Sequence, residues 1–495
     1  MNEAIAPPAG GAADEVQKFG YTQKLKRSVT SYESFALAFS IISITTGIFT
    51  TYGFALAVAG PRGIWMWIVA GTGQMLVVLI LAQLATHIPL SGSSYQWASR
   101  LANPKVGWGF GWLSYAFFAI ATVSVAYALS TQALAPLFGW ELSTTQATEL
   151  TIGVVALWAL LSIFSTQAVA GLNAAAVVTE VLGVVGISIA LLVVVAVSGD
   201  GSVSNLTSRG EIPGAGYYAL NGPFMLAVLL GAFTLTGFEA AANMAEETKQ
   251  PERAVPWAIV RAAAASVLLG LFFLLALTVA IPDVPEIAGS AAPVAQIMHD
   301  QLGNTVEKLF LVVVSISIFA TGTVCMVSGS RIVYAMSRDR RFPLHRLFAI
   351  VPARLRTPMP ATVLIFAGAA LIMAFVGSDP ETLSNLFTAT AILPAIIYMS
   401  TMILFLATRK RLPGRSRYFD LGRFAVPIAV GAIVWLAFEL TALLFPSIFW
   451  TSVKIVGVFI GVGAVVMIGN LLFARDALEH EPGAVALDSE VPAEH

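Results

Sequence analysis

Long apolar stretches separated by short polar segments dominate the chain. A bilayer-spanning helix needs about 20 mostly apolar residues, and twelve stretches approach or exceed that length. They fall at residues 34–59, 64–87, 106–136, 149–167, 171–197, 222–245, 256–281, 306–336, 360–376, 383–408, 424–445 and 450–473. Several are longer than the minimum, which predicts tilted or interrupted helices. The pattern therefore predicts an all-α polytopic membrane protein with twelve transmembrane helices.

The composition narrows the class further. Of the 495 residues, 57% are hydrophobic and 11% are charged, whereas a soluble domain carries about 25% charged residues. This deficit excludes a soluble multidomain enzyme, a disordered protein and a nucleic-acid-binding protein. The single cysteine, Cys325, excludes an intramolecular disulfide and a thiolate metal site. We therefore expect no metal, cofactor or nucleic acid. The expected partners are a small-molecule substrate and the lipid bilayer, and the oligomeric state is left open.

The positions of lysine and arginine predict the orientation, because cytoplasmic loops carry an excess of both. With the N-terminus inside, all but four of the 27 Lys and Arg residues lie on the cytoplasmic side or at its helix ends. The four exceptions are Arg62, Arg209, Lys308 and Lys454. Residues 1–30 and 476–495 are then cytoplasmic tails, the second acidic and disordered. Residues 31–475 form the membrane domain, which we expect in a prokaryotic plasma membrane.

Two spans carry threonine beside glycine near mid-depth. The first contains Thr45-Thr46-Gly47 and the sixth contains Thr236-Gly237. Each lies in the first helix of a five-helix block if residues 31–197 and 222–408 are read as two repeats. Helices interrupted at corresponding positions of two halves point to a transporter site, because the freed N–H groups and the helix dipole can bind a carboxylate. The alternative is that these small residues only allow close helix packing.

Several longer motifs resemble the amino acid–polyamine–organocation (APC) permeases. The similar segments are Gly237-Phe238-Glu239 with 245–256, then 330–339, 342–343 and 357–361, and the loop-like stretch 89–97 after the second span. Asp420-Leu421-Gly422-Arg423-Phe424 is similar to the amino acid/choline transporter branch, which includes GABA permeases. The resemblance covers about residues 30–475. It implies a LeuT-like 5+5 inverted repeat with broken helices 1 and 6, followed by two further helices at 424–473.

The resemblance also implies a substrate site between helices 1, 3, 6, 8 and 10. It assigns the backbone amides of Thr45, Thr46 and Gly47 to a substrate carboxylate, and the second break adds Thr236 and Gly237. Phe233 matches the position of an aromatic gate that closes over the substrate. The alternative for Phe233 is an ordinary core or lipid-facing side chain.

Carboxylates inside the spans are functional candidates, because a membrane-buried charge costs about 2.5–3.5 kcal/mol on insertion scales. Glu180 lies in the fifth span with no lysine or arginine within one helical turn, and the resemblance places it where some relatives carry a lysine near a sodium site. We predict that Glu180 carries a coupling proton; a cation ligand or a structural hydrogen bond are the alternatives. Glu239 follows the second glycine closely, and we predict that it contacts a substrate amine, senses protons or caps local backbone.

The remaining polar candidates concern the gate and the coupling ion. Glu246, Glu247 and Arg253 are interpreted as interfacial gate or loop charges. The alternative is a solvated face, and for Glu246 this interpretation as a solvated loop residue is the favoured one. If Na⁺ replaces H⁺ as the coupling ion, the candidate ligands are hydroxyls of the eighth span, with Ser315 chosen first among Ser315, Ser317, Thr321 and Thr323. Serine in a membrane helix more often bonds back to the preceding turn, so we rank sodium coupling below proton coupling.

Together these features predict a secondary active transporter rather than an enzyme. The five histidines are scattered and no phosphate-binding glycine loop occurs, so no catalytic residue is assigned. The expected activity is proton-coupled symport, by alternating access, of amino acids or related amines such as GABA. The alternatives are a choline or polyamine transporter, an exchanger without ion coupling, and a membrane amino-acid sensor that does not transport.

Overall fold

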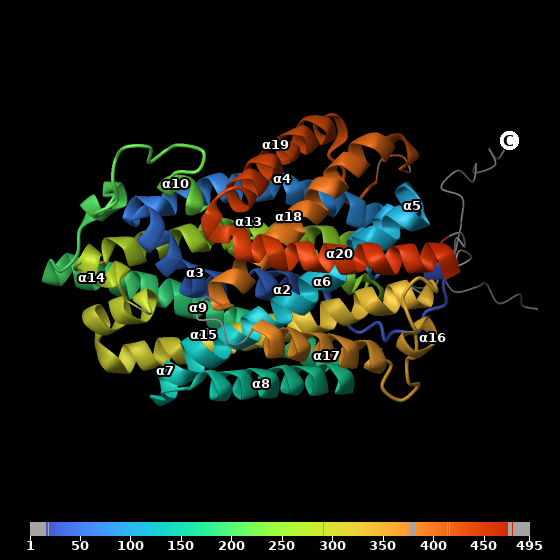
Figure 1. Ribbon diagram of the computed structural model, residues 1–495, viewed down its shortest axis with the longest axis horizontal. Coiled ribbons are helices and arrows are strands. Elements are labelled where there is room, and N and C mark those ends of the chain that lie inside the picture. Colours follow the sequence, from blue (N-terminus) through green and yellow to red (C-terminus); the bar gives the residue numbers. More distant parts are fainter. Residues whose placement is uncertain are drawn as a thin grey trace, which may run out of the picture.

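The computed structural model shows a bundle of long helices that lie roughly along one axis (Figure 1). It describes residues 16–17, 19–290, 292–376, 382–412, 414, 416–473 and 478. The predicted acidic tail from residue 476 therefore lies outside the described residues, apart from Leu478, as does much of the predicted N-terminal tail. The all-α fold expected from the apolar pattern is confirmed.

The helices follow the predicted spans closely in position. The long helices are α4 (Met66–His87), α6 (Pro104–Ala128), α8 (Thr144–Phe164), α9 (Thr166–Ser198), α13 (Pro251–Val279), α15 (Pro293–Arg338), α17 (Met359–Val376), α18 (Thr382–Thr408), α19 (Ala425–Leu444) and α20 (Trp450–Phe473). The first span is divided into α2 (Ser31–Ile42) and α3 (Ile44–Ala59). Short helices include α5 (Ser93–Leu101), α7 (Ala135–Phe138), α14 (Val284–Ala288) and α16 (His345–Phe348).

Eleven helical segments of the described chain are long and apolar enough to cross a membrane, against the twelve expected. The missing one is the sixth span, which the structure divides into α10 (Pro223–Leu226), α11 (Val228–Thr234) and α12 (Ala240–Asn243). The apolar part of this segment, Pro223–Thr234, is too short to count by itself. The difference therefore arises because this span is interrupted.

The break in the first span lies earlier than expected. Ser43 alone leaves the helical conformation, with φ 28° and ψ 94°. Its hydroxyl accepts a hydrogen bond from the Thr46 amide at 3.2 Å and so caps α3. Thr45, Thr46 and Gly47 are helical residues of the first turn of α3. The expectation that these three residues are themselves unwound is wrong. The Ser43 hydroxyl, at the N-cap, bonds an amide of the first turn and so allows the helix to begin before them.

The break in the sixth span lies where the Thr-Gly pair indicated. Residues 235–239 separate α11 from α12. Gly237 has φ 81°, a conformation that favours glycine. The Gly237 amide is held by the Tyr398 hydroxyl of α18 at 3.0 Å, so the interrupted backbone is bonded inside the protein.

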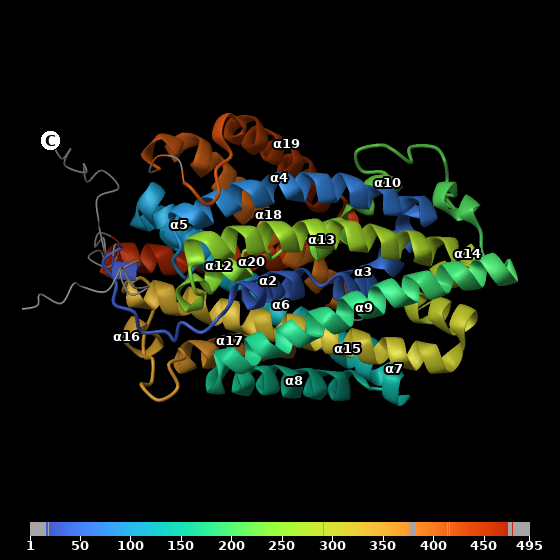
Figure 2. The ribbon, with the colours of Figure 1, turned by 180° about the vertical axis from the view of Figure 1, so that it is seen from behind.

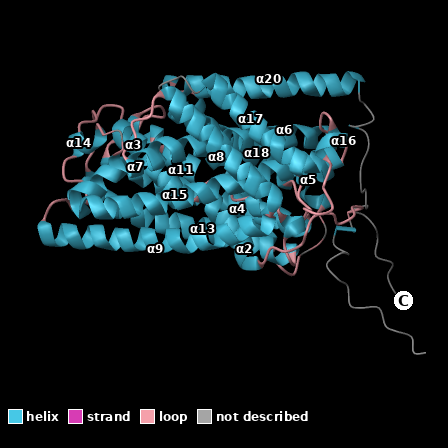
Figure 3. Cartoon of the chain, turned by 90° about the horizontal axis from the view of Figure 1, so that it is seen from below, coloured by secondary structure: helices cyan, strands magenta, loops and turns pink. Residues whose placement is uncertain are grey.

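The broken first helix lies inside the bundle, where α2 packs against α9, α13 and α15. By contrast, α20 and α9 run along opposite edges of the molecule (Figure 3). The arginine-rich segments that follow α15 and α18 lie at the same end of the bundle as α5: Arg341 bonds Ser99 and Arg411 bonds the Leu101 carbonyl. We call this the basic end; α16 lies there as well (Figures 1 and 2).

Candidate functional site

The two helix breaks lie against each other. A Cβ atom added to Gly47 would overlap the Thr234 side chain of α11, and one added to Gly237 would come within 3.1 Å of Ile41 of α2. Glycine at these two positions is therefore what lets the interrupted helices approach. Close helix packing was the alternative explanation for these glycines. The structure contains both the close packing and the two helix breaks.

A small buried cavity of about 30 Å³ lies between the breaks. It is lined by Ile41, Ile42, Thr46, Gly47, Phe117, Ala121, Val125, Phe233, Thr236, Thr321, Cys325 and Thr390. These residues come from the first, third, sixth, eighth and tenth predicted spans, the set that the resemblance implied. A cavity of this size holds about one or two water molecules. A solute as large as an amino acid enters only if the walls move.

Phe233 is the aromatic wall of this cavity. It is the penultimate residue of α11, and its ring lies 4.5 Å from the ring of Phe387 in α18, measured between centroids. The side chain is buried, so it is not lipid-facing. Its position between the two breaks is compatible with the gate predicted from the resemblance.

Glu180 of α9 lies at the first break, outside the lining of the cavity. Its Oε1 atom accepts hydrogen bonds from the Thr45 amide at 2.8 Å and from the Ser43 hydroxyl at 3.0 Å. The side chain is buried, and no arginine or lysine of the described chain forms an ion pair with it. The Thr45 amide, one of the three assigned to a substrate carboxylate, is thus occupied by a carboxylate of the protein.

The hydroxyl groups beside Glu180 join α2, α3 and α15. Thr46 Oγ1 lies 2.6 Å from Ser43 Oγ and 3.3 Å from Thr321 Oγ1. The Thr321 hydroxyl donates to the Ser40 carbonyl of α2 at 2.7 Å. Ser315, the predicted sodium ligand, bonds instead to Leu311 of its own helix at 2.7 Å and lies about 9 Å from Thr321 along the axis. Among the hydroxyls of α15, Thr321 rather than Ser315 belongs to this group.

Glu239 occupies the second break, and it too lies outside the cavity lining. The Tyr398 hydroxyl donates to Glu239 Oε2 and accepts from the Gly237 amide. The ring of Tyr398 stacks on Phe238 with centroids 5.1 Å apart. Tyr398 of α18 therefore holds the Glu239 carboxylate in place. The same hydroxyl connects this carboxylate to the Gly237 amide in the break.

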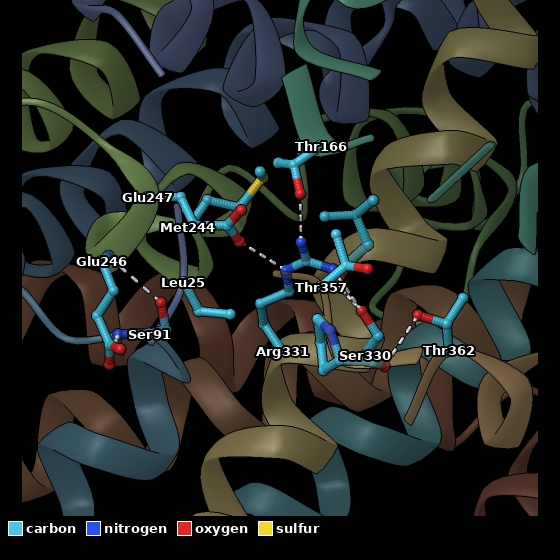
Figure 4. Close-up of polar contacts among 12 residues, drawn as sticks. Leu25, Ser91, Thr166, Met244, Glu246, Glu247, Ser330, Arg331, Thr357 and Thr362 are labelled. Atoms are coloured by element: carbon cyan, nitrogen blue, oxygen red, sulfur yellow. Dashed lines mark hydrogen bonds and ion pairs between the residues drawn. The ribbon is translucent and has the colours of Figure 1, made fainter. Parts of the chain in front are cut away.

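A cluster of buried charges closes the basic end (Figure 4). Arg331 Nε lies 2.8 Å from Glu247 Oε1, and both side chains are fully buried. The other guanidinium nitrogens of Arg331 donate to Ser330 and to Thr166 of α9. The pair joins the segment after α12 to α15 and α9. The predicted gate residue Glu247 thus pairs with Arg331 and not with Arg253, which lies on a different surface.

Glu246 belongs to the same cluster. Its carboxylate accepts from the Arg338 guanidinium at 2.9 Å and from the Ser91 amide at 3.2 Å. The side chain is 1% exposed, so the interpretation of Glu246 as a solvated loop residue is wrong. The Arg338 partner is 92 positions away in the sequence, which explains why local sequence did not reveal it.

The chain before α2 crosses the basic end and pairs with the same loop. The Val29 amide donates to the Glu247 carbonyl at 2.9 Å, and the Lys249 amide donates to the Val29 carbonyl at 2.8 Å. The Tyr21 hydroxyl donates to Asp339 at 2.9 Å. Burial, and then the charge of Asp339, raise the pKa of Tyr21, so this hydroxyl stays a neutral donor at physiological pH.

Arg331 and Glu439 are buried charged residues that were not among the candidates. Arg331 appeared only inside a motif, and Glu439 of α19 was overlooked. Glu439 Oε2 accepts from Gln74 of α4 at 3.2 Å and is 1% exposed. The criterion that selected Glu180, an acidic residue in an apolar span without a nearby basic residue, would also have selected Glu439.

These features define a multi-pass helical membrane protein with two interrupted helices beside a buried cavity. A family model described as "Amino acid permease" matches residues 32–468. The chain belongs to this family, which confirms the expected APC permease.

Comparison with curated proteins agrees with this assignment. The chain is 28% identical over 469 residues to the amino-acid permease BAT1 of Arabidopsis thaliana, with 88% of each chain covered. It is 28% identical to the BAT1 homolog of Oryza sativa, with 87% of each covered. It is 25% identical to amino-acid permease 2 of Neurospora crassa, covering 87% of this chain and 81% of the relative. These relatives are named permeases and not enzymes.

Proposed function

We propose that the protein is a secondary transporter of amino acids or related small amines, such as the ω-amino acid GABA. One observation carries the proposal: the cavity lined by Thr46, Gly47, Phe233 and Thr236 lies between two interrupted helices. Interrupted helices at mid-membrane are the architecture in which transporters bind substrate and alternate access. The amino-acid permease names of the relatives support this substrate class.

The substrate carboxylate is proposed to bind at the start of α3, where the helix dipole favours an anion. All three amides are bonded within the protein: that of Thr45 to Glu180, that of Thr46 to the Ser43 hydroxyl and that of Gly47 to the Ser43 carbonyl. Only Thr46 and Gly47 also face the cavity. We therefore assign the anchor to Thr46 and Gly47, whose bonds to Ser43 would open as the carboxylate binds, and give Thr45 a part in holding Glu180. Glu239, connected to Gly237 through Tyr398, is proposed to transmit occupancy to the second break or to meet the substrate amine when the walls open.

Proton coupling through Glu180 is the second part of the proposal. Glu180 is buried at the first break and its acceptor bonds come from backbone and hydroxyl groups, with no cationic partner in the described chain. Such a carboxylate can gain and lose a proton while it changes the bonds of the broken helix. Na⁺ coupling, exchange without an ion, and choline or polyamine as substrate are the alternatives that the experiments below separate.

The basic end is proposed to face the cytoplasm. It gathers the arginines of α15, α18 and the loops after them, as the positive-inside rule requires. Both termini would then be cytoplasmic and the protein would lie in a plasma membrane. A prokaryotic source stays a prediction, since the relatives named above are from plants and a fungus.

The native cysteine provides a direct test of the site. Cys325 is the only cysteine in the chain and lines the cavity. We expect saturating amino acid substrate to slow the reaction of Cys325 with a small membrane-permeant thiol reagent several-fold, because bound substrate fills the space beside the thiol. The rate of labelling of purified protein, followed by mass spectrometry, measures this protection.

The control moves the thiol away from the cavity. In a Cys325→Ser, Thr145→Cys variant the new thiol lies on the exposed first turn of α8, and substrate should leave its labelling unchanged. Amino acids, GABA, choline and putrescine are compared as protectants. Protection of Cys325 by none of them would contradict the site. Equal protection by choline or putrescine would contradict the carboxylate anchor. Protection without uptake in liposomes would identify a sensor.

Removal of the aromatic wall should weaken substrate retention. Phe233→Ala deletes the ring that separates the cavity from Phe387. We expect the apparent KM for uptake to rise about tenfold or more, because a large apolar contact is lost. Initial rates of uptake into proteoliposomes measure the effect. Phe375→Ala removes a lipid-exposed phenylalanine of α17 and serves as the control. Wild-type kinetics in Phe233→Ala would remove this residue from the gate.

A further inference from the structure

A groove opens on the outside of the bundle between the first turns of α2 and α13. Its volume is about 630 Å³, roughly twenty times that of the cavity between the breaks. Its lining residues are Ser31, Tyr32, Phe35, Gln250, Arg253, Ala254, Trp257, Ala258 and Arg261. It is separate from the substrate site, because the two share no lining residue.

Positive charge is concentrated on one wall of this groove. Arg253, Trp257 and Arg261 follow one another at four-residue spacing and so lie on one face of α13. The Arg261 guanidinium lies 5.3 Å from the centre of the Trp257 ring. Within the described chain, neither arginine has a carboxylate at ion-pair distance, and none of the lining residues is acidic. The nearby Glu33 is engaged in the capping box of α2 with Thr30.

Two helix N-termini also lie near the positive charge of this groove. α2 begins at Ser31 and α13 begins at Pro251. The bonds of Val29 to the Glu247 carbonyl and the Lys249 amide hold the two starts together. Ser31 and Gln250, at the two starts, line the groove, so both helix N-termini lie at its mouth. Each first turn also holds a carboxylate, Glu33 or Glu252, which offsets the helix dipole. The anion site therefore rests on the two guanidinium groups.

The rest of the lining is suited to a lipid. Phe35, Ala254 and Ala258 form the apolar part of the lining, and the exposed apolar face continues along α13 to Leu268, which is 69% exposed. Tyr32 and Trp257 are 50% and 40% exposed, and aromatic residues of this kind occur where a helix crosses the headgroup region. A soluble anion would gain nothing from the apolar part. The combination favours an amphiphile with an anionic head.

We propose that this groove binds the phosphate of an anionic glycerophospholipid between Arg253 and Arg261, with its acyl chains along the exposed face of α13. The lipid would bridge α13 and α2, the first half of the interrupted helix, close to the charge cluster at the basic end. It would thereby stabilise the arrangement in which these two helices are packed together.

The test measures binding and does not depend on transport. Delipidated full-length protein is titrated with phosphatidylglycerol or phosphatidylcholine and examined by native mass spectrometry. We expect wild type to bind phosphatidylglycerol more tightly. Arg253→Gln with Arg261→Gln should weaken this binding about tenfold or more, since each basic residue near anionic lipid contributes about fivefold. Arg253→Lys with Arg261→Lys keeps the charge and should retain most of the binding.

The matched control removes equal charge at the same end of the molecule. Arg340 and Arg346 are exposed and lie outside the groove, so Arg340→Gln with Arg346→Gln should bind phosphatidylglycerol as wild type does. An equal loss in this control would show general attraction to charge and would overturn the site. Unchanged binding in the Arg253/Arg261 glutamine variant would also overturn it. Displacement of the lipid by an equimolar amount of inorganic phosphate would identify a site for free anions instead.

Discussion

Glu180→Gln should abolish accumulation driven by a pH gradient while substrate binding and exchange persist. A gradient of about one pH unit supplies about 1.4 kcal/mol per proton, enough for roughly tenfold accumulation by a one-to-one symporter. Glutamine preserves the size and can still accept from the Thr45 amide and the Ser43 hydroxyl, which now bond to Glu180. It cannot carry a proton. The measurement is uptake into proteoliposomes with an imposed pH gradient, compared with exchange at equal pH.

Glu439→Gln provides the matched control for this experiment. Glu439 is also a buried membrane carboxylate, but it bonds Gln74 between α4 and α19 and does not bond either helix break. Its replacement should therefore leave gradient-driven uptake intact. If Glu180→Gln kept the pH dependence of wild type, the proton role of Glu180 would be lost. If uptake then followed a sodium gradient, Thr321 and the Ser40 carbonyl, which lie 2.7 Å apart, would be the first ligands to examine.

Glu247→Ala should destabilise the protein by about 3–5 kcal/mol, because it leaves the Arg331 charge buried without its partner. Both side chains of this pair are fully buried, and Arg331 also donates to Thr166 and Ser330. The remaining hydroxyl acceptors cannot neutralise the guanidinium. Thermal unfolding can be followed by the loss of the helical circular dichroism signal, which does not depend on access to Cys325.

Replacement of both members separates the charge effect from a loss of packing. Glu247→Met with Arg331→Met removes the isolated charge and should recover much of the stability lost in Glu247→Ala. A double variant no more stable than the single one would show that the hydrogen bonds of Arg331, and not its buried charge, dominate. Wild-type stability in Glu247→Ala would mean that the pair contributes little to closing the basic end.

Local sequence predicted the features that depend on local physics. The spans follow from the length of apolar runs, and the second break lies at Gly237 because only glycine readily adopts its backbone conformation. The first break was predicted in the right span but lies at Ser43, since the side chain that caps α3 precedes the Thr-Thr-Gly motif. The count of long helices differed by one because the sixth span is interrupted.

The partners of the charged residues could not be predicted in this way. Arg331 and Glu247 are 84 positions apart, and Arg338 and Glu246 are 92 apart. The sequence around each of these charged residues therefore does not show which residue is its partner. The same holds for Arg253, which the loop motif placed at a gate and which the structure places in a surface groove with Arg261.

The sequence by itself determined the class of the protein, its membrane segments, the two interrupted helices and the small set of carboxylates worth testing. Apolar length, glycine conformation and the cost of a buried charge act within a few neighbouring residues. Only the tertiary structure decided which groups those carboxylates meet: the Thr45 amide for Glu180, Tyr398 for Glu239 and Arg331 for Glu247. Burial removes water as a partner, so each charged or polar group must find another from a different helix, and helix packing decides which one is within reach.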